Sequence, residues 1–167
     1  MDKEFTRQYY LEQLINRKNN RLIKIITGIR RCGKSYLLRT LFKKHLLLKG
    51  VKENHIIEIA FDLYDNIDFR NPRFFYAWAK ELLKDDETYY FLLDEVQLLD
   101  DFVSVLNGLA NKKDCDVYVT GSNAKFLSKD IATEFGGRGD EIHMYPLSFP
   151  NSWKYMKETD TMVGMNI

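Results

Sequence analysis

Cysteine is scarce in this sequence, with only Cys32 and Cys115 among 167 residues. Two cysteines are too few for the disulfide framework of a small secreted domain, and they fit a reducing compartment. Long apolar runs are missing as well, because the longest covers residues 74–79 and a membrane span needs about 20 apolar residues. The charged residues 1–4 also lack the apolar segment of a signal peptide. We therefore expect a cytoplasmic protein that does not bind a membrane.

An excess of charge of one sign is also absent, since the formal net charge is +1. The two ends of the chain differ, however. Residues 1–53 hold 14 Lys and Arg against 4 Asp and Glu, whereas residues 55–167 hold 11 against 20. A basic face can bind a polyanion, but the solvent side of two helices would carry the same residues. Nucleic acid therefore stays open as a partner, and the net charge gives no argument for it.

Hydrophobic patterns predict strands that alternate with helices along the chain. The strands are expected at residues 21–28, 55–63, 88–96, 115–120 and 141–145. The helices are expected at residues 4–16, 33–48, from Asn71 and Pro72 onward, 102–109, and around 124–135. Such alternation is typical of crossover connections, which build a parallel sheet with helices on both faces. The fold class is therefore α/β, with one domain over residues 1–150.

The strongest motif is a phosphate-binding loop of the form G-x-x-x-x-G-K-S, between a predicted strand and a predicted helix. Its glycines allow the backbone to wrap closely around phosphate, and the amides at the start of the helix favour an anion. Lys34 would lie between the β- and γ-phosphates, and the Ser35 hydroxyl would bind Mg²⁺. The predicted nucleotide-binding residues are Gly28, Ile29, Arg30, Arg31, Cys32, Gly33, Lys34, Ser35 and Tyr36. ATP and Mg²⁺ are thus the expected ligands.

A second motif is the apolar strand that ends in Asp94 and Glu95. A nucleotide hydrolase needs a carboxylate near Mg²⁺, and Asp94 can supply it. Hydrolysis also needs a base that orients the attacking water, which is the role we assign to Glu95. Without the phosphate loop, the two acids would simply be the end of a strand; with it, they predict an ATPase.

Three further candidates lie near the ends of the later strands. Ser122 and Asn123 follow the fourth strand, where a polar side chain can contact the γ-phosphate or the attacking water, although a Gly-Ser-Asn sequence also forms ordinary turns. Arg138 precedes the fifth strand and can stabilise charge on the nucleotide of a neighbouring subunit. The alternative interpretation is that Arg138 is an ordinary solvated arginine in a loop.

Two other functions compete with ATP hydrolysis. A kinase with the same phosphate loop has less use for Glu95, and it would need an acceptor pocket and an arginine-bearing lid that the sequence does not reveal. A non-hydrolysing nucleotide-binding or interaction module would fit a chain without a helical lid. An assay of phosphate release with and without acceptors separates the three.

These motifs together resemble a known family. The order of phosphate loop, Asp-Glu strand, polar strand end and late arginine looks like an AAA+ ATPase core. In particular, GIRRCGKS, LDEVQL, TGSNAKFLSKDIA and YPLSF, which begin at residues 28, 93, 120 and 145, resemble predicted bacterial and archaeal AAA+ ATPases. Members of that family usually carry a C-terminal region likened to restriction endonucleases, so this chain looks like the N-terminal nucleotide-binding domain. The resemblance implies the strand order 5-1-4-3-2 and self-association in which Arg138 acts on a neighbour.

The resemblance ends after Pro150, and residues 151–167 form a tail unlike the family. One choice of codons for residues 158–167, preceded by one G and read in a shifted frame, encodes Gly-Asp-Arg-Tyr-Asp-Gly-Trp-Asn-Glu-Tyr. That continuation resembles the family at this point. We therefore hypothesise that the tail arises from a frameshift in a longer gene. Sequencing of the locus tests this, because the other frame must then continue in the family pattern.

Overall fold

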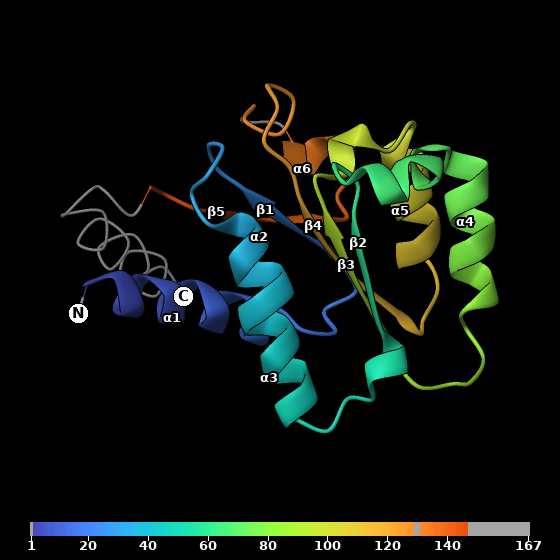
Figure 1. Cartoon of the computed structure of the whole chain (residues 1–167), viewed down its shortest axis with the longest axis horizontal. Coiled ribbons are helices and arrows are strands. Elements are labelled where there is room, and N and C mark those ends of the chain that lie inside the picture. Colours follow the sequence, from blue (N-terminus) through green and yellow to red (C-terminus); the bar gives the residue numbers. More distant parts are fainter. Residues whose placement is uncertain (1, 129–130, 147–167) are drawn as a thin grey trace.

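The computed structural model describes residues 2–128 and 131–146 (Figure 1). The tail at residues 151–167 and its frameshift hypothesis lie outside the described residues. Five parallel strands form one sheet, in the order β2-β3-β4-β1-β5. The strands are β1 (Ile23–Thr27), β2 (Ile56–Ala60), β3 (Tyr89–Asp94), β4 (Cys115–Thr120) and β5 (Gly139–His143). This confirms the predicted fold class and strand order.

Helices cover both faces of the sheet (Figure 1). One face carries α1 (Asp2–Asn16) and a continuous helical segment made of α2 (Lys34–Tyr36), a π-helical stretch (Leu37–Phe42) and α3 (Lys43–Leu48). The other face carries α4 (Pro72–Glu81) and α5 (Phe102–Ala110). Three short 3-10 helices cover Glu53–His55, Tyr64–Arg70 and Val96–Leu98, and α6 covers Ile131–Glu134. No helix among the described residues is long and apolar enough to cross a bilayer.

Side chains that alternate along the strands build a separate core on each face of the sheet. From β1, Ile23 and Ile25 join the core under α4 and α5, whereas Ile26 joins the core under α1 and α3. The inner strands are buried on both faces, and all six residues of β4 are buried. This two-sided burial explains why the strands are dense in Ile, Val and Leu rather than alternating.

Local signals in the sequence explain some of the helix boundaries. The Asn71 side chain accepts a hydrogen bond from Phe74 N at 3.0 Å, and Pro72 begins α4, as predicted. The prediction for residues 124–135 was too long, because α6 is confined to Ile131–Glu134 within that range. A turn stands at residues 124–127 instead, closed by a hydrogen bond from Leu127 N to Asn123 O at 3.1 Å.

The fifth strand begins and ends two residues earlier than predicted. Its position is set by pairing with β1, in which Ile23 lies opposite Gly139 and Thr27 opposite His143. The Thr27 hydroxyl also donates to Glu141 at 2.7 Å. The apolar residues Met144 and Tyr145 suggested a later strand, but they follow the last paired residue. Pairing with β1 therefore determines where this edge strand begins and ends.

The strand order places three loops side by side at the carboxyl ends of the strands, which form one edge of the sheet. Strand β4 lies between β1 and β3, so their carboxyl ends are neighbours. Ile26 pairs with Thr120, and Leu93 pairs with Val119. The phosphate loop, the Asp94-Glu95 pair and the segment after Thr120 therefore meet at the edge where ligands of parallel sheets bind.

Candidate functional site

The phosphate loop leaves β1 through Gly28, which lies against the end of β5. Gly28 has φ 147°, and a Cβ there would lie 2.6 Å from Met144 O and 2.8 Å from Cys32 Sγ. No larger residue fits this space. Gly33 has φ 101°, in the left-handed region, and turns the chain into α2. The loop conformation thus depends on both glycines of the motif.

The first turn of the helix after Gly33 presents free backbone amides. Leu37 N donates to Gly33 O at 3.0 Å, which is the first α-type hydrogen bond of the segment. The amides of Lys34, Ser35 and Tyr36 precede it, so they have no partner within the helix. Together with the helix dipole, they form an environment that favours an anion.

Lys34 is buried, with 4% of its surface exposed. Its Nζ donates to Gly28 O at 2.8 Å and to Ile29 O at 2.9 Å, and it lies 3.7 Å from Cys32 Sγ. Two of these partners are backbone carbonyls, and none is a carboxylate. A buried ammonium ion without a carboxylate partner retains a strong attraction for an anion.

Ser35 links the phosphate loop to the acidic end of β3. Its Oγ donates to Asp94 Oδ1 at 2.9 Å, and Thr120 Oγ1 donates to the same oxygen at 2.5 Å. The site therefore contains a hydroxyl and a carboxylate in direct contact, and oxygen ligands of this kind suit Mg²⁺. Asp94 and Ser35, predicted as metal ligands from distant parts of the chain, are brought together.

Burial raises the pKa of Asp94 above its ordinary value, although the hydrogen bonds from Thr120 and Ser35 act in the opposite direction. Only 3% of Asp94 is exposed. The net rise means that the ionised carboxylate is under-stabilised by its surroundings. A bound cation would supply what the carboxylate lacks.

Glu95 has an unusual backbone conformation, with φ 55° and ψ 49°. Such a left-handed conformation is costly for a residue with a side chain, and it is common at functional sites. Its backbone N donates to Thr120 Oγ1 at 3.0 Å. The Glu95 carboxylate accepts hydrogen bonds from Ser122 Oγ, at 2.9 Å, and from Gln97 Nε2. Predicted residues Glu95 and Ser122 thus lie in direct contact.

Asn123 and Arg138 do not join this cluster. The Asn123 side chain accepts from Phe126 N at 3.1 Å, so it closes the turn after β4. Arg138 precedes β5 at the amino ends of the strands, which form the opposite edge of the sheet. Its carbonyl accepts a hydrogen bond from Ile23 N, and its guanidinium contacts Asn107 O at 3.5 Å. Because β1 has five residues, at roughly 3.3 Å per residue Arg138 lies about 17 Å from the phosphate loop of its own chain.

The remaining loop residues form its outer surface. Arg30 and Arg31 are exposed, and Ile29 is 51% exposed. Tyr36 is 44% exposed, and the Arg7 guanidinium lies 4.9 Å from the centre of its ring. Cys32, in contrast, is buried under the loop. The loop therefore combines exposed cations with a buried thiol and a buried ammonium group.

Sequence reasoning did not assign roles to two residues of this network, Thr120 and Gln97. Thr120 ends β4 beside β3, so its place could be inferred once the strand order was known. Gln97 carries no signal apart from its position two residues after Glu95. Its Oε1 is buried without a hydrogen-bond partner, which leaves one acceptor free next to the Glu95 carboxylate.

Relatives of the chain were found among curated proteins. An uncharacterised protein of Haemophilus influenzae is 36% identical over 145 residues, which are 86% of this chain and 36% of the relative. An uncharacterised protein of Methanocaldococcus jannaschii is 30% identical over 137 residues, which are 80% of this chain and 28% of the relative. The chain thus spans about a third of the length of the curated relatives that it matches.

Solved structures share the fold at low sequence identity. A chain in the structure of Drosophila ORC bound to DNA matches with a TM-score of 0.57 and 12% identity, over 87% of this chain and 93% of that one. DnaA from Aquifex aeolicus, bound to AMPPCP, matches with a TM-score of 0.50 and 15% identity, over 95% of this chain and 50% of that one. Identities this low establish the fold alone.

A family comparison covers most of the chain. Residues 20–152 match the family model described as AAA domain. This range contains the whole sheet, the phosphate loop, the Asp94-Glu95 pair and Ser122. The chain therefore belongs to the AAA domain family, and its fold is that of a nucleotide-binding domain of the AAA+ ATPase type.

Proposed function

We propose that this domain binds Mg·ATP and hydrolyses its γ-phosphate. The observation that carries the proposal is the 2.9 Å hydrogen bond from Ser35 Oγ to Asp94 Oδ1. It joins the helix of the phosphate loop to the acidic end of β3, and Glu95 follows directly. An anion site, a cation site and a candidate base thus lie at one edge of the sheet.

The residues present fit both ligands. Lys34 provides a buried ammonium group that has two backbone carbonyls and Cys32 Sγ as partners and no carboxylate, and the free amides of the first helical turn add to the attraction for phosphate. Ser35 and Asp94 provide the oxygen atoms that would hold Mg²⁺, and burial raises the pKa of Asp94 in a way that a cation would reverse. Mg²⁺, when bound, supplies charge neutralisation for the phosphate oxygens.

The Glu95 carboxylate would orient the attacking water and accept its proton. Ser122 and Gln97 both donate hydrogen bonds to this carboxylate, which hold it in place. Thr120 connects the two acids, since it donates to Asp94 and accepts from the Glu95 amide. In this arrangement Ser122 positions the base rather than contacting the nucleotide.

Parallel measurements of nucleotide binding and phosphate release test the proposal. Glu95→Gln should retain ATP binding and lower phosphate release by about 10²-fold or more, because the shape is preserved and the base is lost. The matched control is Glu134→Gln, an exposed glutamate outside the site, which should change neither. ATP binding without phosphate release by the unaltered chain would favour a non-hydrolysing module. Consumption of ATP only with an acceptor would favour a kinase.

We also propose that Arg138 acts on the nucleotide of a neighbouring subunit. Its position at the opposite edge of the sheet from Lys34 supports this, because it cannot reach the site of its own chain. Turnover per chain should then rise with protein concentration, and Arg138→Ala should abolish the rise while nucleotide binding is kept. Turnover that is independent of concentration would contradict a role between subunits.

Nucleic acid is a further proposed partner of the longer protein. The names of matched structures describe ORC bound to DNA and a DNA replication initiation factor, and they support the proposal only by likeness of fold. The curated relatives extend well beyond the matched region. In the resembled family that extra length carries an endonuclease-like region, which we propose for the full-length relatives. The cytoplasmic location stays a prediction from the sequence.

A further inference from the structure

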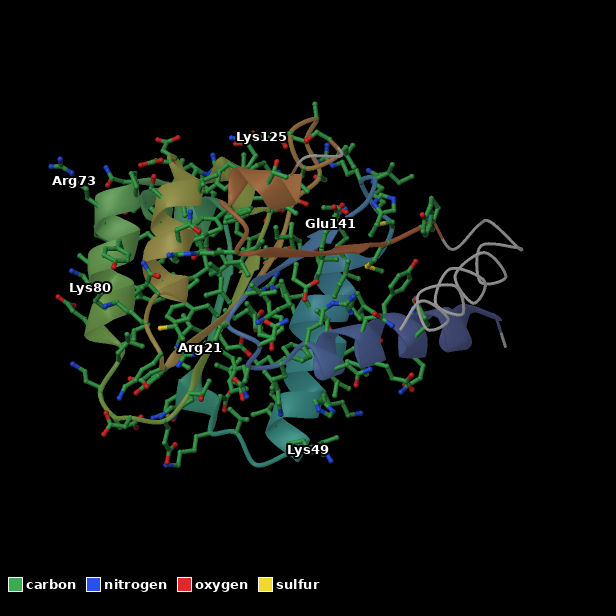
Figure 2. The ribbon with its side chains drawn as sticks, turned by 180° about the vertical axis from the view of Figure 1, so that it is seen from behind. Arg21, Lys49, Arg73, Lys80, Lys125 and Glu141 are labelled. Carbon is green, nitrogen blue, oxygen red and sulfur yellow. The ribbon has the colours of Figure 1, made fainter. Side chains whose placement is uncertain are left out.

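A second cluster of ligand-type side chains lies at the edge of the sheet opposite the phosphate loop. His55 ends the 3-10 helix Glu53–His55 just before β2, and Asp85 and Glu87 lie in the segment just before β3. Strands β2 and β3 are parallel neighbours in which Ile56 pairs with Tyr90, so these segments meet. In Figure 2, Lys49 marks the end of the sheet where this cluster lies, and Lys125 marks the opposite end, where the phosphate loop lies.

The imidazole of His55 is fixed and almost fully buried, with 3% of its side chain exposed. It stacks on Tyr89 with ring centres 4.4 Å apart. Its Nδ1 lies 2.8 Å from Asn54 Oδ1. Its Nε2 lies 3.0 and 2.8 Å from the two oxygens of Asp85 and 3.5 Å from Glu87 Oε2.

Both ring nitrogens of His55 thus face oxygen acceptors, although a neutral imidazole has a single N–H. If Nδ1 donates to Asn54, the lone pair of Nε2 points at two carboxylates. A metal ion bound by Nε2 and the two carboxylates would satisfy all three groups.

We propose that this cation is Zn²⁺, held by His55 Nε2, Asp85 and Glu87. The three ligand atoms lie within 4.8 Å of one another. A tetrahedral zinc ion with bonds of about 2.0–2.2 Å needs ligand atoms about 3.3 Å apart, and the observed separations from Nε2 of 2.8 and 3.5 Å lie on either side of that value.

The surroundings of the cluster fit a zinc ligand set in two further ways. A histidine that binds zinc usually donates its other N–H to an oxygen, as His55 Nδ1 can to Asn54. The imidazole also favours zinc over Mg²⁺ or Ca²⁺, which prefer oxygen ligands. A pocket of about 230 Å³, lined by His55, Glu87 and Lys52 among others, gives access from solvent and room for a water molecule as fourth ligand.

Lys52 opposes the site. Its Nζ lies 3.1 Å from Glu87 Oε1, and both side chains are more than half exposed. The ammonium charge lowers the local attraction for a cation, so its removal should strengthen zinc binding. This expectation distinguishes the proposed site from general attraction of metal to a protein surface.

Calorimetric titration with Zn²⁺ tests the proposal on the full chain, without a polyhistidine tag and without nucleotide. One zinc ion should bind per chain. Asp85→Asn and Glu87→Gln should each lower the affinity tenfold or more, because each removes a ligand charge. Asp86→Asn, an exposed acid between them, is the matched control and should change the affinity less than twofold. Lys52→Ala should raise it several-fold.

Cobalt gives an independent readout, because tetrahedral Co²⁺ absorbs strongly in the visible range and octahedral Co²⁺ weakly. Loss of this absorption in Asp85→Asn, with retention in Asp86→Asn, supports the site. His55→Gln changes a buried residue, so the test rests on the exposed carboxylates, with circular dichroism to show that each variant is folded. Absence of zinc binding, or equal binding by Asp85→Asn, Glu87→Gln and Asp86→Asn, overturns the proposal.

Discussion

Two buried lysines, ten residues apart on one segment, have opposite surroundings. Lys24 is fully buried in β1, with an ion pair to Asp116, a hydrogen bond to Asn20 Oδ1 at 3.1 Å and the Tyr118 ring at 4.7 Å. Lys34 is almost as buried, but its partners are two carbonyls and a thiol. Within residues 2–128 and 131–146 it has no ion pair.

The difference shows how one type of side chain can hold two strands together in one place and, in the proposed function, bind a ligand in another. The charge of Lys24 is neutralised by a carboxylate of the same chain, so it holds β1 to β4. The charge of Lys34 has no carboxylate partner among the described residues, which is what the proposed phosphate site requires. Burial of an ammonium group is therefore no sign of function by itself; the chemistry of its partners decides.

Among the substitutions that test this comparison, Lys24→Met should have the largest effect, which is a loss of stability. It leaves Asp116 buried, with 3% exposed, and without its cation, which costs about 3–5 kcal/mol of stability. Urea unfolding monitored by circular dichroism measures the loss.

The paired change of Lys24→Met and Asp116→Asn sharpens that test. Removing both charges should recover much of the stability, because no unpaired charge stays buried and the amide oxygen can still accept from Tyr118 Oη and Asn19 N. If the double variant is as unstable as the single one, the ion pair is not the reason for the loss.

Lys34→Ala should lower ATP affinity by about 2–3 kcal/mol, or roughly a hundredfold, through loss of a charged hydrogen bond. Its free energy of unfolding without nucleotide should change by less than about 1 kcal/mol, since no carboxylate is left unpaired. Calorimetric titration with ATP and urea unfolding give the two values. Near-native affinity in a folded variant would remove Lys34 from the site.

Asp94→Asn should have the smallest of these main effects, and it should raise the stability rather than lower it. Because burial raises the pKa of Asp94 in the folded chain, the folded state holds this proton more tightly than the unfolded state. The group therefore destabilises the fold as the pH rises from its unfolded pKa through its folded pKa. At pH 7 and without Mg²⁺, the variant should gain about 1 kcal/mol.

The stability gained through Asp94→Asn should vanish in acid, below the ordinary pKa of 3.8. There the Asp94 carboxyl of the unaltered chain is protonated in both the folded and the unfolded state. Urea unfolding across this pH range checks the trend. A loss of stability at pH 7 would mean that the ionised carboxylate is well stabilised by Ser35 and Thr120, contrary to the direction of its pKa.

Several features of the fold and the site could be predicted because their causes are local. The phosphate loop depends on residues 28–35, which are adjacent in the chain, and the start of α4 depends on Asn71 and Phe74, three residues apart. The inner strands were recognised by their apolar runs. Asn123 shows the limit of such reasoning, since the same local chemistry that suggested a site residue closes a turn to Phe126 instead.

Contacts between distant segments were beyond the reach of sequence patterns. The pairing of Lys24 with Asp116, of Asp94 with Thr120 and of His55 with Asp85 joins residues 92, 26 and 30 positions apart. Nothing in the spacing of these residues signals that they touch. The bounds of β5 also escaped prediction, because an edge strand is defined by its pairing with β1 rather than by its own apolar residues.

The sequence by itself determined the α/β class, the phosphate loop and the acidic end of β3, because hydrophobic periodicity and turn chemistry act over a few residues. Tertiary structure alone decided which lysine is neutralised by a carboxylate of the chain and which has no carboxylate partner among the described residues. It also placed Ser122 and Gln97 on Glu95, and His55 between two carboxylates. The physical reason is that strand order, set by packing of the whole sheet, determines which ends of distant strands become neighbours.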